Sequence, residues 1–316
     1  MKTYLVQRLT IALLTLFGMS VVIFVLLRLA PGDIVDILFS TAGYVDPDAR
    51  RTIMRELGID RPLVVQYGDW IWQILHGDLG KSYRYDLPAW EIIRPLLPVT
   101  LELALLSLVV AVCLGVPTGV VSAVRQDSTL DYVLRVVSLA GLSMPSFWLG
   151  MVIILGLVAW LGWIPPMTYV PPTENFRLNA VQFLLPALAV GYRSSALIMR
   201  ITRSSVLEVL REDYIRTARA KGQRPRVVVW RHAFRNAMLP VVTVIGIEFA
   251  FLIGGLIVTE SVFNLPGVAR FLVEAILWRD YPMVQNLVMF IAIVVILSNL
   301  AVDMLYGFLD PRVRYG

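Results

Sequence analysis

The sequence predicts an all-α, polytopic membrane protein with six transmembrane helices. Hydrophobic residues make up 58% of the 316 residues, charged residues make up 16%, and the mean hydropathy is +0.73. Soluble domains of this length do not have such a composition. Six apolar runs carry their charges mainly at the ends, and each has the ~20 residues that an α-helix needs to cross a hydrocarbon core of ~30 Å.

The first apolar run covers about residues 9–30, and we interpret it as a retained membrane anchor. A basic stretch precedes it, as in a secretory signal peptide, but the run is too long for such a signal and no A-x-A-like cleavage site follows. The remaining runs cover about residues 98–124, 133–161, 181–200, 237–259 and 281–305. Six crossings place both termini on the same side of the membrane.

Basic residues in the short connections predict the cytoplasmic side, because Lys and Arg are retained there during insertion. The N-terminal Lys2 and Arg8, the 125–135 connection, the 200–235 segment and a tail with Arg312 and Arg314 all fall on one side. We therefore expect both termini in the cytoplasm.

The segment 31–97 is expected on the outer side, where it forms a cap packed on the helices. Asp46-Pro47 provides a helix start and Gly58 a stop, which predicts a helix over about residues 47–57. A second helix is predicted over residues 62–75. Its apolar face consists of Leu63, Tyr67, Trp70, Ile71 and Ile74.

No catalytic or metal site emerges from the pattern of reactive residues. The stretch Gly77 to Ser82 ends like a phosphate-binding loop, but Leu75 stands where the motif requires its first Gly, and a surface turn explains it better. The single Cys113 lies in an apolar run, and the two histidines, His76 and His232, are expected on opposite sides of the membrane. We therefore expect no enzymatic activity, no cofactor and no metal.

Four ionisable residues lie inside the apolar runs, where burial of a charge is costly and often marks a pathway. Two of them, Glu102 and Asp303, lie near the ends of their spans, and we interpret both as residues in structural pairs or in contact with interfacial water. The third ionisable residue is Arg193. Glu248 lies nearest to the middle of a span. Its position is compatible with a transport pathway and, equally, with a structural hydrogen bond.

The segment 200–235 is the most informative, with ten Lys or Arg residues and three acids. Its position between two apolar runs excludes a nucleic-acid patch. The spacing predicts a helix over residues 205–220, a break at Gly222 and a second helix that begins at Pro225. An ordinary basic loop on anionic lipid is the alternative, although it requires no such pattern around a fixed glycine.

The residues of this segment resemble a known family. Tyr214 to Gly222, followed by His232, residues 235–237 and Pro240, is similar to the EAA loop of ABC-importer permeases of the dipeptide, oligopeptide and nickel branch. Arg216-Thr217-Ala218 stands where the general family pattern has Glu-Ala-Ala, so the role of that Glu cannot be transferred. The resemblance covers nearly the whole chain, with further matching stretches at residues 31–33, 57–62, 77–80, 144–147, 263–267, 279–282 and 310–312.

The resemblance implies the fold of a type I ABC importer permease. Residues 1–97 would form the first span and the cap, residues 98–306 a five-helix core that contains the coupling loop 200–236, and residues 307–316 a cytoplasmic tail. It also implies a bacterial inner-membrane location and four kinds of partner: a second, related permease, two ATP-binding subunits, an extracytoplasmic solute-binding protein and membrane lipid. The residues implied to couple to the ATPases are Arg216, Thr217, Ala218, Arg219, Ala220, Lys221 and Gly222.

In such importers the short helix of the loop sits in a groove of the ATPase and moves as a lever. Ala218 and Ala220 would permit a close approach, and Arg216, Arg219 and Lys221 would supply charge complementarity.

The segment after the fifth span would lie near an outer gate, with Glu260, Phe263 and Asn264 joining Glu248 as gate or pathway residues. A plain turn explains the composition of residues 260–267 equally well. A stand-alone ion-coupled transporter is the alternative function, although the chain shows no obvious internal repeat. The substrate stays open among peptides, glutathione-like compounds, opines, nickel chelates and sugars, with peptides favoured by the resemblance alone.

Overall fold

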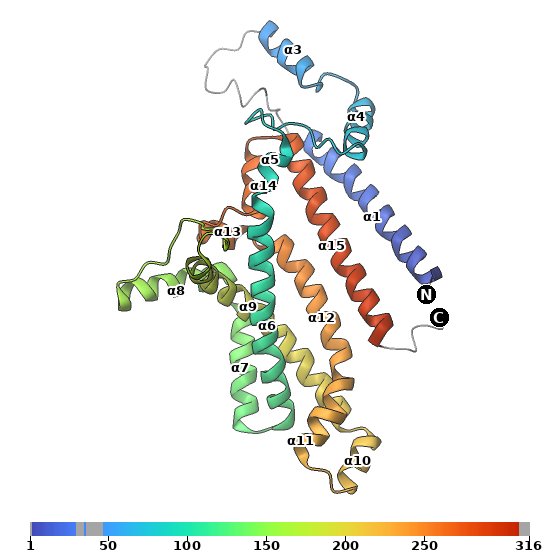
Figure 1. Cartoon of the computed structure of the whole chain (residues 1–316), viewed down its shortest axis with the longest axis vertical. Helices are drawn as coiled ribbons and strands as arrows, with labels where there is room; N and C mark the ends of the chain where they lie inside the picture. Colours follow the sequence, from blue (N-terminus) through green and yellow to red (C-terminus); the bar gives the residue numbers. More distant parts are fainter. Residues whose placement is uncertain (1, 30–34, 36–46, 310–316) are drawn as a thin grey trace. The chain divides into compact units, whose positions relative to one another are not determined.

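The computed structural model describes residues 2–29, 35 and 47–309, and every named element in this part of the chain is a helix (Figure 1). The all-α class is therefore confirmed. The stretches 31–33 and 310–316, with Arg312 and Arg314, lie outside the described residues. The helices are α1 (Lys2–Leu29), α3 (Pro47–Glu56), α4 (Leu63–Leu75), α5 (Ala89–Ile93), α6 (Leu96–Val124), α7 (Thr129–Ser143), α8 (Ser146–Leu161), α9 (Phe176–Leu210), α10 (Asp213–Ala220), α11 (Pro225–Val227), the π-helix η1 (Val228–Ala233), α12 (Phe234–Gly255), α13 (Ile257–Val262), α14 (Val268–Leu277) and α15 (Tyr281–Leu309).

Among the described residues, five helical stretches are long and apolar enough to cross a membrane. They are Val6–Leu29, Ala89–Val124, Phe176–Leu210, Pro225–Gly255 and Tyr281–Val302. These stretches correspond to all the apolar runs except the third. A sixth crossing is formed if α7 and α8 together count as one span.

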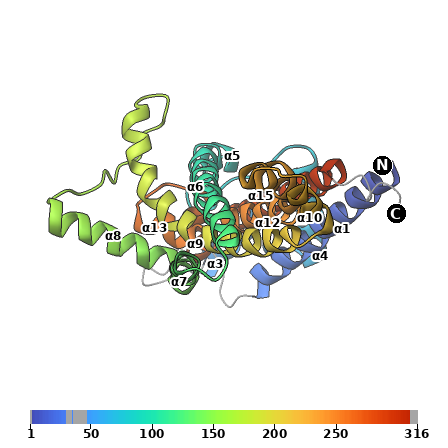
Figure 2. The same ribbon diagram turned by 90° about the horizontal axis from the view of Figure 1, so that it is seen from below.

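The third apolar run, predicted as a single span over residues 133–161, is two helices. α7 and α8 meet at an angle of 103°, and Figure 2 shows α7 nearly end-on while α8 lies across the view. Met144 between them is extended, with φ −97° and ψ 130°, because a following proline disfavours the helical conformation. Pro145 also lacks the N–H that would continue the helix. The run that was predicted as one span is therefore fully broken at this position.

The chain divides into two compact units, the first of which comprises residues 1–99 and 266–296. In this unit α4 packs on α1 through Phe24, Tyr67 and Trp70, whose ring centroids lie 5.2–6.1 Å apart. Aromatic rings at these distances contribute packing energy beyond the area they bury. A separate apolar core joins α5, α14 and α15 and consists of Ala89, Ile93, Val268, Leu272, Ala275, Met283, Val284 and Leu287.

Both helices predicted for the cap are present as α3 and α4. Gly58 follows α3 with a φ of +67°, a conformation that glycine adopts without the steric cost of a Cβ. Of the expected apolar face of α4, Trp70 is buried and Leu63 is exposed.

The turn at residues 77–82 is fixed to the start of α15 by a buried carboxylate. Asp280 accepts hydrogen bonds from the hydroxyl of Ser82 and from the backbone N–H groups of Tyr83 (3.1 Å) and Arg84 (3.3 Å). Several donors on one carboxylate compensate for the loss of its hydration. The stretch that resembled a phosphate-binding loop is therefore a structural turn.

The second unit comprises residues 100–265 and 297–316, and in it α6 and α9 approach each other closely at glycines. A Cβ added to Gly115 would lie 2.7 Å from the Ser195 carbonyl oxygen, and a Cβ added to Gly191 would lie 2.6 Å from that of Ser107. Gly119 makes an equally close approach one turn after Gly115. Small residues at this spacing let membrane helices pack backbone against backbone.

We predict that Gly191→Ala destabilises the protein by about 1–3 kcal/mol, because the added methyl group forces α6 and α9 apart. The measurement is the apparent midpoint of thermal unfolding of the purified protein in detergent. Gly254→Ala is the matched control, because nothing lies within 4 Å of its added Cβ and alanine is the better helix former. Equal midpoints for the two variants would show that the close approach is not required.

Candidate functional site

The basic segment (residues 200–236) forms a hairpin of short helices between the end of α9 and the start of α12. The single helix predicted for residues 205–220 is wrong, because α9 ends at Leu210 and α10 begins at Asp213. Glu212 between them is extended, with φ −64° and ψ 148°, so the chain changes direction there. The predicted start at Pro225 is confirmed, since this proline is the first residue of α11.

Gly222 ends α10 as predicted. Its φ is +74°, in the left-handed region that residues with a Cβ avoid. The N–H of Gly222 donates to the carbonyl of Arg219 (2.9 Å), and that of Gln223 donates to the carbonyl of Ala218 (3.4 Å). These two bonds form the Schellman pattern that satisfies the last carbonyls of a helix.

α10 is supported by an apolar cluster of its own. Ile215 and Ala218 on α10 pack against Val228 and Ala233 of η1, and all four are buried. The side chain of Ala218 therefore faces the inside of the hairpin. The small side chain of Ala218 thus allows α10 to pack closely on η1, and its expected part in coupling to an ATPase stays a prediction.

Polar contacts join α10 to η1 and to the start of α12. The Asn236 side-chain amide donates to the Tyr214 hydroxyl (2.8 Å), and this hydroxyl donates to the carbonyl of His232 (3.5 Å). The carbonyl belongs to η1, and π-helical turns of this kind occur frequently at functional sites. Together, the apolar cluster and these bonds make the hairpin one compact piece.

The outward surface of the hairpin is basic. Nine of its ten Lys and Arg residues are exposed, and Arg203 is the exception. The side chains that are exposed along α10 and at its end before Gly222 are Arg216, Thr217, Arg219, Ala220 and Lys221. The hairpin therefore presents a positively charged tip, and the exposed apolar side chains that follow it are Val227 (37%) and Trp230 (56%).

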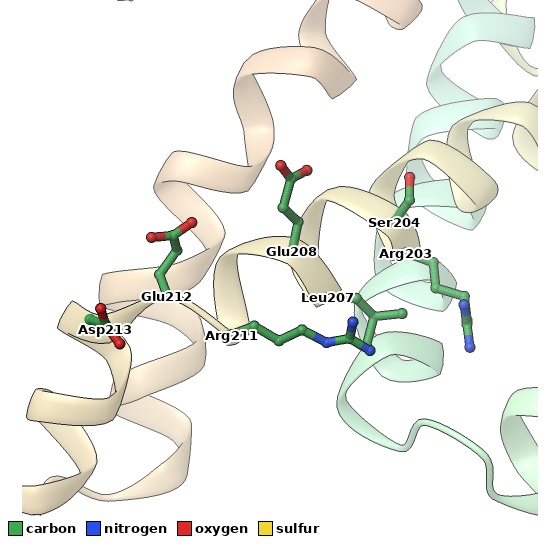
Figure 3. A pocket seen from close by; sticks show the side chains of 7 residues that line it. All are labelled: Arg203, Ser204, Leu207, Glu208, Arg211, Glu212 and Asp213. Atoms are coloured by element: carbon green, nitrogen blue, oxygen red, sulfur yellow. The ribbon is translucent and has the colours of Figure 1, made fainter.

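A groove of about 530 Å³ lies at the junction of α9 and α10 (Figure 3). Its lining side chains come from the last turns of α9, the connection 211–212 and the first residue of α10, and they carry both signs of charge. They are Arg203, Ser204, Leu207, Glu208, Arg211, Glu212 and Asp213.

A buried ion pair fixes the base of the hairpin. The Arg203 guanidinium on α9 donates to both carboxylate oxygens of Asp131 on α7, at 2.9 and 2.7 Å. The hydroxyl of Ser122 on α6 and the backbone N–H of Asp127 also donate to this carboxylate. Asp131 is 0% exposed, and a bidentate pair with further donors is the arrangement in which a buried carboxylate is fully compensated.

Sequence reasoning did not identify this ion pair. The two residues are 72 positions apart, and each alone looks ordinary: an acid in the first turn of a helix and an arginine near a helix end. The one available signal was the arginine within the apolar pattern of α9, since such residues usually have a partner.

The proposed gate residues Glu260, Phe263 and Asn264 lie on α13 and the turn after it. Glu260 is 0% exposed and accepts a hydrogen bond of 2.6 Å from the Thr100 hydroxyl. The Phe263 ring covers Gly150 of α8 so closely that a Cβ there would lie 2.7 Å from it.

Asn264 and Glu248 occupy different settings. Asn264 has a φ of +53° and donates to the carbonyl of Met167 (3.0 Å), so the predicted turn chemistry is present at this position. Glu248 is half-buried in the middle of α12. Glu248 and the other three proposed gate residues therefore belong to different structural elements.

The other ionisable residues of the spans have structural surroundings. Glu102 accepts from the side-chain amide of Asn179 (3.4 Å), which fits the pairing expected for it. Arg193 is exposed on α9. Asp303 lies in α15, but its side chain lies outside the described residues. Cys113 is exposed, and no group of three potential metal ligands occurs among the residues that the structure describes.

Comparisons with known proteins place the chain among transport proteins. The family model for the binding-protein-dependent transport system inner membrane component matches residues 115–315, and the model for the N-terminal part of such components matches residues 1–104. A di/tripeptide transport system permease protein of Pseudomonas aeruginosa is 40% identical, over 100% of this chain and 99% of the relative. The dipeptide transport system permease protein of Escherichia coli K12 is 39% identical over the same shares. A putative peptide transport system permease protein of Brucella abortus is 40% identical over 100% of both chains.

We predict that Arg203→Met destabilises the protein by about 3–5 kcal/mol, because it leaves the Asp131 carboxylate buried without its cation. The double variant Asp131→Leu/Arg203→Met should be less destabilised than Arg203→Met, since no unpaired charge remains. The midpoint of thermal unfolding in detergent measures both. Arg61→Met is the control, because the Arg61–Asp69 pair is more than half exposed on both sides and such pairs contribute about 0–1 kcal/mol. An equal loss in the Arg61 and Arg203 variants would contradict the assignment.

Proposed function

We propose that this chain, which belongs to the family of binding-protein-dependent transport system inner membrane components, is the permease subunit of an ATP-driven importer of di- or oligopeptides. It is a multi-pass inner-membrane protein of the ABC-importer class. The peptide assignment is supported by 39–40% identity over the full chain to relatives whose names state di/tripeptide or dipeptide transport. A stand-alone ion-coupled transporter is not supported, because the family depends on a binding protein.

The importer contains four kinds of partner in this proposal. A second, related permease completes the translocation pathway, two ATP-binding subunits drive it, an extracytoplasmic binding protein delivers the peptide, and lipid surrounds the helices. Both termini lie in the cytoplasm, together with the basic segment, because its ten Lys and Arg residues carry the strongest positive-inside signal of the chain.

The observation that carries the proposal is the construction of the hairpin around α10. Its apolar face is already covered by η1 through Ile215 and Ala218, so what it offers to another protein is the charged tip around Gly222. Exposed Arg216, Arg219 and Lys221 there fit an acidic groove on an ATPase subunit and set the rate and specificity of docking. Thr217 and Ala220 lie on the same exposed surface.

The hairpin is also suited to transmit motion. α9 runs without interruption from Phe176 to Leu210, a length of about 50 Å at 1.5 Å per residue. The Asp131–Arg203 pair and the cluster of Val120, Val206 and Ala237 fasten its end to the neighbouring helices. A displacement of α10 by the ATPases is therefore passed to the core of the second unit as a rigid-body movement between two states.

The peptide pathway is proposed near α12 and α13. Glu248 is the half-buried carboxylate of α12, and burying a charged group within the membrane is costly unless it faces protein or water. Glu260, Phe263 and Asn264 form the proposed gate at α13, supported by the packing of Phe263 on Gly150 of α8.

We predict that proteoliposomes containing this chain, its partner permease and the ATPases take up a labelled dipeptide only when the binding protein and ATP are present. Uptake is measured by retention of the label on filters. Liposomes containing this chain alone, with an imposed proton or sodium gradient, are the control. Gradient-driven uptake in that control would disprove the proposed class.

We predict that Gly222→Val leaves assembly intact but lowers dipeptide uptake per ATP hydrolysed at least tenfold, because a β-branched residue resists a φ of +74°. Gly162→Val is the matched control: Gly162 ends α8 with a φ of +61° and also has no atom within 4 Å of an added Cβ. Both variants carry similar backbone strain, so only a coupling role separates them. Equal uptake-to-hydrolysis ratios in the two variants would show that the turn is not part of the coupling device.

A further inference from the structure

A second pocket, in the first compact unit, has features of a binding site that the import function does not use. It has a volume of about 250 Å³ and lies among the end of α1, the cap helices α3 and α4, the 79–83 turn and the start of α15. All of its lining residues belong to this unit. Arg28 lines it at the end of the first membrane span, Val6–Leu29, which places the pocket at the level of the membrane surface.

Two residues that line this pocket each carry a buried N–H donor that has no hydrogen-bond partner among the described residues. The donors are Nε1 of Trp70 and Nε2 of Gln285, on side chains that are 9% and 3% exposed. A buried N–H group without a partner costs free energy comparable to a lost hydrogen bond, so such groups are usually satisfied by a ligand or by water. Both groups donate only, and the missing partner is therefore an acceptor.

The charges around the pocket favour an anionic acceptor. The Arg28 guanidinium donates to the Gln66 side-chain oxygen (2.9 Å) and to the Phe24 carbonyl (3.3 Å), and no described carboxylate forms a salt bridge with it. Of the two acids in the lining, Asp69 is already paired with Arg61 at 3.0 Å, and Glu56 is exposed. A guanidinium together with two neutral N–H donors is a set that suits the oxygens of a phosphate group.

The apolar surface next to the pocket indicates where such a phosphate comes from. α4 contributes donors to the pocket, yet several of its large apolar side chains face outward, a pattern typical of a helix that lies in the membrane interface. Leu29, at the end of α1, is 73% exposed as well. The outward side chains of α4, with their exposed fractions, are Leu63 (55%), Val64 (84%), Val65 (45%), Trp72 (66%) and Leu75 (75%).

We propose that this pocket binds the phosphate group of a membrane phospholipid whose acyl chains lie against the exposed apolar residues of α1 and α4. Arg28 neutralises the phosphate, and Trp70 and Gln285 donate hydrogen bonds to its oxygens. Tyr83 also lines the pocket, and burial raises the pKa of its hydroxyl to about 12. The bound lipid would join the cap helices to α15 by bridging residues from both.

The test counts lipids that stay bound to the purified, assembled transporter. The complex is equilibrated in detergent with dioleoylphosphatidylglycerol, and retained lipid is measured by native mass spectrometry over a range of lipid concentrations. Trp70→Phe keeps an aromatic ring and removes the N–H, and Gln285→Leu removes the amide at similar size. Each should weaken the tightest retained lipid by about tenfold or more, as the loss of a hydrogen bond to a charged group does.

Trp90→Phe is the matched control, since Trp90 lies on α5 in the same unit, is 50% exposed and does not line the pocket. Its lipid retention should equal that of the unchanged protein. Equal retention in the Trp70, Gln285 and Trp90 variants would overturn the proposal. Dioleoylglycerol, which has the same acyl chains but no phosphate, should not be retained, and its retention at the same concentrations would also overturn it.

Inorganic phosphate separates the two possible sources of the oxyanion. Added at millimolar concentration, it should not displace the lipid, because the acyl chains supply much of the binding energy. Displacement that depends on Trp70 and Gln285 would show that the pocket takes a free oxyanion and would overturn the assignment to lipid.

Discussion

The close approach of α6 and α9 is the constraint on which the second unit depends. Gly115, Gly119 and Gly191 remove the side chains that would hold these two helices apart. In a membrane, where lipid competes equally well for apolar surfaces, such backbone contact is a principal source of helix association. It places α9 in the interior, and α9 is the helix that continues into the basic segment. The packing of α6 on α9 inside the core therefore helps to determine where the charged tip lies outside it.

The base of the basic segment combines this packing with a buried charge pair. Asp131 and Arg203 link α7 to α9, and Ser122 adds α6 to the same network. Such a pair contributes little net stability compared with apolar residues of similar volume, but removing one partner is costly. Its value lies in specifying one arrangement of three helix ends. A lever that transmits force requires a base of this kind, because movement at a loose base would be lost before reaching the core.

The first unit uses a different principle, in which loops are held by single buried side chains. Asp280 gathers the Ser82 hydroxyl and two backbone N–H groups. The pocket beside it leaves donors of Trp70 and Gln285 without partners among the described residues. At the Asp280 site, the hydrogen bonds are therefore formed within the protein. The N–H groups of Trp70 and Gln285, in contrast, require an acceptor from another molecule. A lipid phosphate bound in this pocket would supply that acceptor, and a molecule of the surrounding membrane would then take part in the hydrogen bonding of the unit.

Local signals in the sequence determined the membrane class, the apolar runs, the two cap helices, the end of α10 at Gly222 and the start of α11 at Pro225. These features depend on residues within a few positions of each other, through hydropathy, proline geometry and the left-handed preference of glycine. Pro145 breaks the third run through its local backbone geometry. Tertiary structure alone decided that Ala218 faces inward. It alone paired Asp131 with Arg203 and brought Trp70 and Gln285 to one pocket. Those outcomes depend on which residues far apart in the sequence come into contact. Local patterns in a single sequence do not specify such contacts.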